Sequence, residues 1–170
     1  DSATFEHREG MLVTIPTTLA VSEYFELARF GQVVLTAEER PFQFTHGNAP
    51  DVDGYAAFLD DLATKVIVLD DDNNDQNDAI SGVSDEPYPY PEPGLSLTNR
   101  FRGGDTITNL SGVMHFDFGQ WRIRPSAAYD YTFTPVNTTP AAPSVGGSVR
   151  VSAFNVLNYF TTIDITASTS

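Results

Sequence analysis

Residues 53–69 read DGYAAFLDDLATKVIVL, and this stretch changes from a helical to an extended pattern near its end. Its larger apolar residues fall at i, i+3, i+4 and i+7, the spacing of one helix face: Tyr55, Phe58, Leu59 and Leu62. Asp51 or Asp53 can cap the first turn, and Lys65 suits the negative end of the helix dipole. The β-branched run Val66-Ile67-Val68-Leu69 follows at once and predicts a buried strand. We therefore expect one helix that leads directly into a strand.

Strand patterns occur on both sides of this stretch. Alternating or β-branched runs, bounded by Gly or Pro, are found over residues 10–16, 19–22, 30–36, 104–118 and 121–125. Several strands with a single helix near the middle are most simply arranged as a small barrel. The sequence thus predicts a mainly β fold, an OB-fold-like small barrel with one inserted helix, over residues 1–134.

The chain is strongly acidic, and its charge is unevenly distributed. It has 170 residues, with 23 acidic and nine basic residues and a net charge of −14; this length suits one ordinary domain. Residues 51–92 hold twelve acids and one base, a net −11, whereas residues 93–160 hold three acids and five bases. The absence of cysteine excludes disulfides and thiolate chemistry. No apolar run approaches the ~20 residues needed to cross a bilayer, so no membrane span is expected.

The acidic loop over residues 70–78, DDDNNDQND, is dense in oxygen ligands. Asp70, Asp72 and Asn74 have the i, i+2, i+4 spacing of calcium loops, and Asp78 could join them. The loop is not an EF-hand, because Asp75 and Ser81 stand where that motif has its Gly and its bidentate Glu. The sequence therefore leaves two interpretations, an irregular Ca²⁺ site or a solvated acidic loop.

The most plausible nucleic-acid surface combines arginines with an aromatic residue. Its members are Arg100, Arg102, Arg122, Arg124 and Trp121. OB-folds hold single strands by aromatic stacking and Arg contacts, and Arg122 and Arg124 fall on one face of a strand. The alternative is that the aromatic residues belong to the core and the arginines pair with neighbouring acids. Because a net charge of −14 opposes a polyanion, we expect any binding of nucleic acid to be weak.

The end of the chain has a different character from the barrel. Residues 135–147 have the Pro- and Gly-rich composition of a linker, and residues 148–170 begin with a strongly apolar strand pattern over 148–160. A strand cannot stand alone, because its amides and apolar side chains need partners. We therefore expect this strand to pair with another part of a protein.

This last strand, VRVSAFNVLNYF over residues 149–160, resembles the opening strand of the endonuclease/exonuclease/phosphatase superfamily, in its branch of bacterial secreted nucleases. Four upstream blocks agree with the accessory domain of that branch: EGMLV (9–13), APDVDGY (49–55), VIVLDD (66–71) and GDTITNLSGV (104–113). One departure is Ser152-Ala153, where the family usually has Ala-Ser.

The resemblance implies a secreted, non-catalytic accessory domain that guides substrate or positions a catalytic domain, followed by the first strand of that catalytic domain. By resemblance, Asn155 helps to hold the scissile phosphate and the metal cluster, Mg²⁺ or Ca²⁺, of the parent enzyme. Phosphodiester hydrolysis also needs a metal, an activated water and a base, and in the family these lie downstream. We therefore expect no enzymatic activity from these 170 residues, and the missing catalytic domain as their partner.

A second hypothesis comes from the same apolar strand. Without its own sheet, the segment 149–160 could add to an open barrel edge of another copy, and contacts that do not close produce filaments. Ca²⁺ bound at the acidic loops would then reduce the repulsion between subunits. The chain would in that case be a structural subunit of an extracellular filament or oligomer.

Overall fold

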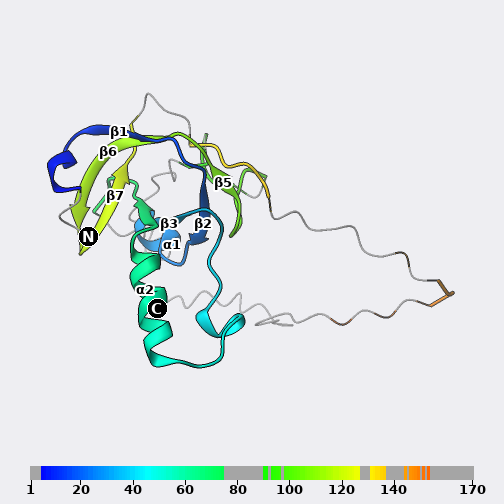
Figure 1. The fold of residues 1–170 in the computed structure, drawn as a ribbon. Helices are drawn as coiled ribbons and strands as arrows, with labels where there is room; N and C mark the ends of the chain where they lie inside the picture. The colour runs from blue at the N-terminus through cyan, green and yellow to red at the C-terminus, as the bar shows by residue number, and fades with distance from the viewer. Residues whose placement is uncertain are drawn as a thin grey trace, which may run out of the picture. The chain divides into compact units, whose positions relative to one another are not determined.

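The computed structural model describes residues 5–74, 90–91, 93–96, 98–126 and 131–136, and residues 144, 146–149, 151 and 153 further on. The chain divides into two compact units, Asp1–Thr138 and Thr139–Ser170. The first unit contains the described helices and strands (Figure 1). Most of the strand predicted over 148–160, with Asn155, lies outside the described residues, as do Asp78 and the rest of the acidic loop after Asn74.

The first unit is mainly β, as predicted. Its strands form a seven-stranded sheet in the order β1-β6-β7-β4-β3-β2-β5. Their bounds are β1 Leu12–Ile15, β2 Leu19–Glu23, β3 Val33–Ala37, β4 Val66–Leu69, β5 Thr106–Ile107, β6 Leu110–Asp117 and β7 Gln120–Arg124.

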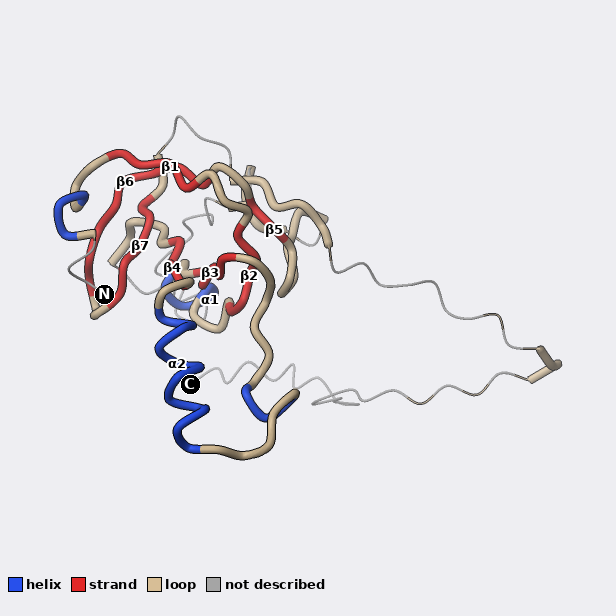
Figure 2. The backbone as a smooth tube through the Cα atoms, viewed as in Figure 1, coloured by secondary structure: helices blue, strands red, loops and turns tan. Residues whose placement is uncertain are grey.

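The sheet curls because β5 and β6 are one bent run of chain. Only Thr108 and Asn109 separate them, and Asn109 has a left-handed backbone with φ 55°. β5 pairs with β2, and β6 pairs with β1 and β7, so this run connects one end of the sheet to the strand next to its other end. The result is a curled, barrel-like sheet, which agrees with the OB-fold-like small barrel that the sequence predicts (Figure 2).

One pairing in the sheet is parallel. β4 and β7 pair over Val68↔Arg122 and Leu69↔Ile123, whereas the other strand pairs are antiparallel. This short ladder joins two antiparallel groups, β2-β3-β4 and β1-β6-β7. It also places the residues that follow β4 beside the middle of β7.

The main helix, α2 (Val52–Ala63), confirms the predicted helix and its first cap. The Asp51 side chain accepts a hydrogen bond from the Gly54 amide at 3.1 Å. Lys65 pairs with Asp61 at 2.9 Å and with Glu38 at 3.4 Å. The bond to Asp61 contributes most, and the bond to Glu38 next, to a raised pKa of Lys65. None of the described helices has the length and apolar character of a membrane span.

The third strand begins later than the predicted start at Phe30. Residues 27–30 form a short helix, α1 (Leu27–Phe30), and β3 begins only at Val33. Gly31 ends α1 in the left-handed conformation with φ 64°, which a glycine adopts at little cost. A single helical turn is too short to show a 3.6-residue period in the sequence.

The barrel core combines strand residues with aromatic residues from outside the strands. Val21, Leu35, Leu69 and Ile123 are fully buried, and Tyr90, Tyr131 and Phe133 pack in the same cluster. The Tyr131 hydroxyl donates to the Ser111 carbonyl at 2.7 Å, and the Tyr90 hydroxyl donates to the Leu69 carbonyl at 3.3 Å. Residues 131–134 therefore also belong to the barrel, and Thr134 forms a bridge with Thr106.

Candidate functional site

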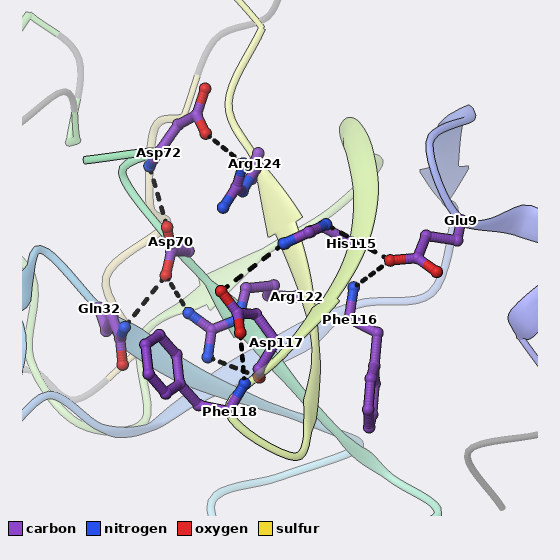
Figure 3. A network of polar contacts seen from close by, with 10 residues as sticks. All are labelled: Glu9, Gln32, Asp70, Asp72, His115, Phe116, Asp117, Phe118, Arg122 and Arg124. Carbon is purple, nitrogen blue, oxygen red and sulfur yellow. Dashed lines mark hydrogen bonds and ion pairs between the residues drawn. The ribbon is translucent and has the colours of Figure 1, made fainter. Parts of the chain in front are cut away.

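The strongest polar cluster lies where the parallel ladder ends (Figure 3). Asp70 follows β4, and its amide donates to the Ile123 carbonyl of β7 at 3.0 Å. This bond holds the Asp70 carboxylate against the Arg122 guanidinium, and the two side chains form an ion pair. Arg122 is only 2% exposed and Asp70 only 5%, so this charge pair is part of the protein interior.

Both oxygens of the Asp70 carboxylate are occupied. Oδ2 accepts from Arg122 and from Gln32 Nε2 at 3.0 Å, and Oδ1 accepts from the Asp72 amide at 3.0 Å. Buried carboxylates are stable only when they are paired and hydrogen-bonded in this way. Sequence reasoning missed Gln32, because a lone amide just before a strand carries no pattern.

Arg122 is held from its other side by the turn between β6 and β7. Its Nη2 donates to the Asp117 carbonyl at 3.1 Å, and the guanidinium lies 5.5 Å from the centre of the Phe118 ring. Phe118 is 81% exposed and has φ 50°, an uncommon conformation for an aromatic residue. The Asp117 side chain accepts from the Phe118 amide at 2.9 Å and so supports this turn.

A second ion pair repeats the first toward the surface. Arg124 Nη1 lies 2.8 Å from Asp72 Oδ1, with side chains 26% and 54% exposed. Arg122 and Arg124 are two residues apart on β7 and so share one face of that strand, and each of them meets one acid from the segment that follows β4. The structure therefore corresponds to the alternative stated from the sequence, in which these arginines pair with neighbouring acids.

The remaining residues of the predicted nucleic-acid surface lie elsewhere. Trp121 is half-buried, with its ring 5.9 Å from that of Phe5 and 4.9 Å from that of Phe116. Arg100 and Arg102 are exposed in the segment that leads to β5, whose Gly104 amide donates to Val21 of β2. Two strands separate β2 from β7 in the sheet. The four arginines therefore do not form a single patch along one strand.

The predicted metal ligands are only partly brought together. Asn74 lines a pocket of about 260 Å³ with Asp70 and Gln32, and Phe30 and Phe118 also line it. Asp72 instead pairs with Arg124. Among the residues that the structure describes, no three His, Cys, Asp or Glu side chains are grouped so that they could hold a metal ion. A cation at Asp70 would have to compete with the guanidinium of Arg122.

The chain matches one family over most of its length. The family model covers residues 3–138, and its description is that of a domain of unknown function, DUF8508. Comparisons with curated proteins and with solved structures give no match. The matched residues include the whole described barrel and both ion pairs.

Proposed function

The chain belongs to the DUF8508 family, and we propose that it is a non-catalytic accessory domain that positions the catalytic domain of a secreted, metal-dependent nuclease. The resemblance of residues 149–160 to the first strand of the endonuclease/exonuclease/phosphatase superfamily supports this origin. The upstream blocks support it too, because VIVLDD covers β4 with Asp70 and Asp71, and GDTITNLSGV covers β5 and the start of β6. The matching blocks thus coincide with the parts that build the barrel.

The accessory domain could either position the catalytic domain or guide the substrate. The ion pair of Arg122 with Asp70 favours the positioning role. Arg122 and Arg124 are both matched by carboxylates, so their charge is neutralised within the protein. Binding of a phosphate backbone requires Lys and Arg charges that can displace counterions. Arginines whose side chains link the segment after β4 to β7 are poor candidates for binding a phosphate backbone. A barrel held together in this way is suited to positioning another domain.

The chemistry then belongs to the parent enzyme and not to the barrel. By resemblance, Asn155 contributes to the phosphate and metal site, and the parent supplies Mg²⁺ or Ca²⁺, the activated water and the base. The 170-residue chain should therefore leave labelled single-stranded and duplex DNA intact in the presence of either metal, and should bind both weakly at 150 mM salt. Turnover above background would contradict the proposal.

The proposed origin is tested on the native protein. An antibody raised against this chain is used to precipitate its natural form from the growth medium of the source cells, and intact mass and nuclease activity are measured. We expect a protein much larger than 18.6 kDa that cleaves DNA with Mg²⁺ or Ca²⁺. A precipitated protein of the mass of this chain, without nuclease activity, would contradict the nuclease origin.

A second candidate function is self-assembly by strand addition, and the edge strand β1 favours it. β1 stands at one end of the sheet order and pairs only with β6 among the described strands. Met11 and Leu12 beside this edge are 52% and 55% exposed. An open edge with exposed apolar residues is a template for another strand, and residues 149–160 of a second copy would suit it.

Light scattering with and without Ca²⁺ tests this second candidate. Assembly that needs Ca²⁺ and disappears when the chain is cut after Gly147 would support strand addition by filament subunits. A monodisperse monomer under both conditions would rule it out.

A further inference from the structure

A groove lies beside α2, away from the Asp70–Arg122 pair. Its volume is about 1060 Å³. Thr36 and Val34 of β3 contribute to it from the sheet, α2 lines it with Tyr55 and Leu59, and the segment before α2 adds further aromatic residues. We call this cavity the α2 groove.

The apolar face of α2 is not covered by the barrel. None of its twelve residues is buried, although Tyr55, Phe58, Leu59 and Leu62 all face the groove. Tyr55 remains 49% exposed and Leu59 44%. A short helix normally owes its stability to the packing of its apolar face. Within the described part of the chain, no element buries this face of α2.

The open face is nevertheless an ordered one. Phe44 lies on the 3-10 turn η3 (Phe44–His46), with its ring 6.0 Å from that of Tyr55 and 5.9 Å from that of Phe58. Gly54 permits this approach, because a Cβ there would lie 3.0 Å from Phe44 Cζ. Figure 1 shows α2 and the segment that carries η3 extending from the barrel on the same side. Aromatic contacts within the chain therefore fix the position of the segment before α2 relative to this helix.

A buried polar atom in the groove wall also lacks a partner. Thr36 is 2% exposed, and its hydroxyl makes no hydrogen bond among the described residues. Buried hydroxyls are normally hydrogen-bonded. The wall of the groove therefore includes one polar atom whose hydrogen-bonding capacity the described residues leave unused.

The charge around the groove selects the class of occupant. Residues 38–65 hold six acids and two bases, a net −4. Glu23 and Asp51 line the groove directly, and the lining cation Arg40 donates to the Ser22 carbonyl at 3.1 Å. We call Glu23, Asp51 and the other acids of residues 38–65 the acidic rim of the groove. Its net negative charge repels nucleic acids and anionic membranes and attracts a cationic partner.

We propose that the α2 groove binds a cationic amphipathic segment of a partner protein, with its apolar side against Tyr55, Phe58 and Leu59 and its basic residues toward the acidic rim. Helices bind in apolar grooves in this manner. The proposal does not depend on the nuclease origin, since it rests on the groove alone.

The test uses the full chain and a fluorescent 18-residue designed peptide with leucines on one helical face and lysines on the other. Fluorescence anisotropy at 150 mM salt should give saturable binding. The double variant Tyr55→Ala/Leu59→Ala should weaken it at least tenfold, because few anchor residues carry most of such binding energy. Both residues are half exposed, and alanine maintains the helix.

Matched controls separate the groove from general charge attraction. Phe25→Ala and Phe118→Ala each remove a ring that is 81% exposed and lies outside the groove. Both variants should leave the affinity for the peptide unchanged. A peptide with glutamate in place of lysine should not bind. Equal binding by all variants, or binding of the glutamate peptide, would overturn the proposal. So would a dimer of the chain alone that the double variant dissociates, because the groove would then belong to a second copy.

Discussion

The two neighbouring ion pairs, Asp70–Arg122 and Asp72–Arg124, allow the contribution of a buried ion pair to stability to be compared with that of an exposed one. Asp70→Asn retains the shape of the side chain and its bond from the Asp72 amide, but it leaves the Arg122 guanidinium, 3% exposed, without a counter-charge. Removing one partner of a buried pair costs about 3–5 kcal/mol. For a domain of this size, that corresponds to a fall in Tm of roughly 10–20 °C.

Asp72→Asn is the matched control, because it breaks the neighbouring pair on the same two elements. Its partners are 54% and 26% exposed, and an exposed pair contributes about 0–1 kcal/mol. Thermal and urea unfolding of both variants, followed by circular dichroism, provide the comparison. The double variant Asp70→Leu/Arg122→Met should recover most of the lost stability, since an apolar pair of similar volume replaces a buried ion pair at little cost. If Asp70→Asn costs no more than Asp72→Asn, the account of the buried pair is wrong.

Three further variants test other contacts of the fold. Gly112→Ala should cost about 1–3 kcal/mol by overpacking, since its Cβ would lie 2.3 Å from the Arg124 carbonyl, whereas Gly47→Ala, with nothing within 4 Å, should be tolerated in the same urea titration. Asp51→Ala should remove the cap of α2 and cost about 1 kcal/mol, seen as a lower urea midpoint; an unchanged midpoint would contradict the capping role. Burial, with the charges of Asp71 and Asp70 adding to it, raises the pKa of Tyr90 well above its usual value. The folded state then retains the Tyr90 proton longer than the unfolded chain, so the stability that this group contributes below about pH 10 is lost as the pH rises further. Tyr90→Phe should reduce this alkaline loss between pH 8 and pH 11, and a parallel decline in both proteins would contradict the shift.

Local patterns predicted the fold well because they act over a few residues. The apolar spacing of Tyr55, Phe58 and Leu59 predicted α2. The expected cap was Asp51 or Asp53, and the structure has Asp51 in that position. The β-branched run Val66-Ile67-Val68-Leu69 predicted β4, which begins at Val66 and ends at Leu69, as expected. The short helix α1 was missed, because one turn carries no period.

The candidate site was less accessible to sequence reasoning because its partners are distant in the chain. Asp70 and Arg122 are 52 positions apart, and only the parallel register of β4 and β7 brings them together. The spacing of Asp70 and Asp72 fits calcium ligation, but the same spacing also fits two arginines on an adjacent strand. The sequence alone left open whether these acids bind calcium or pair with arginines. The register of β4 and β7 brings Asp70 to Arg122 and Asp72 to Arg124.

The parallel ladder between β4 and β7 also bears on how the barrel folds. The hairpins β2-β3 and β6-β7 are closed by short connections, whereas the ladder must close a longer loop before it gains any contact. We expect these two hairpins to form before the ladder. Substitutions at Asp70 and Arg122 should then accelerate unfolding far more than they slow folding. This ladder would set the lifetime of the native state.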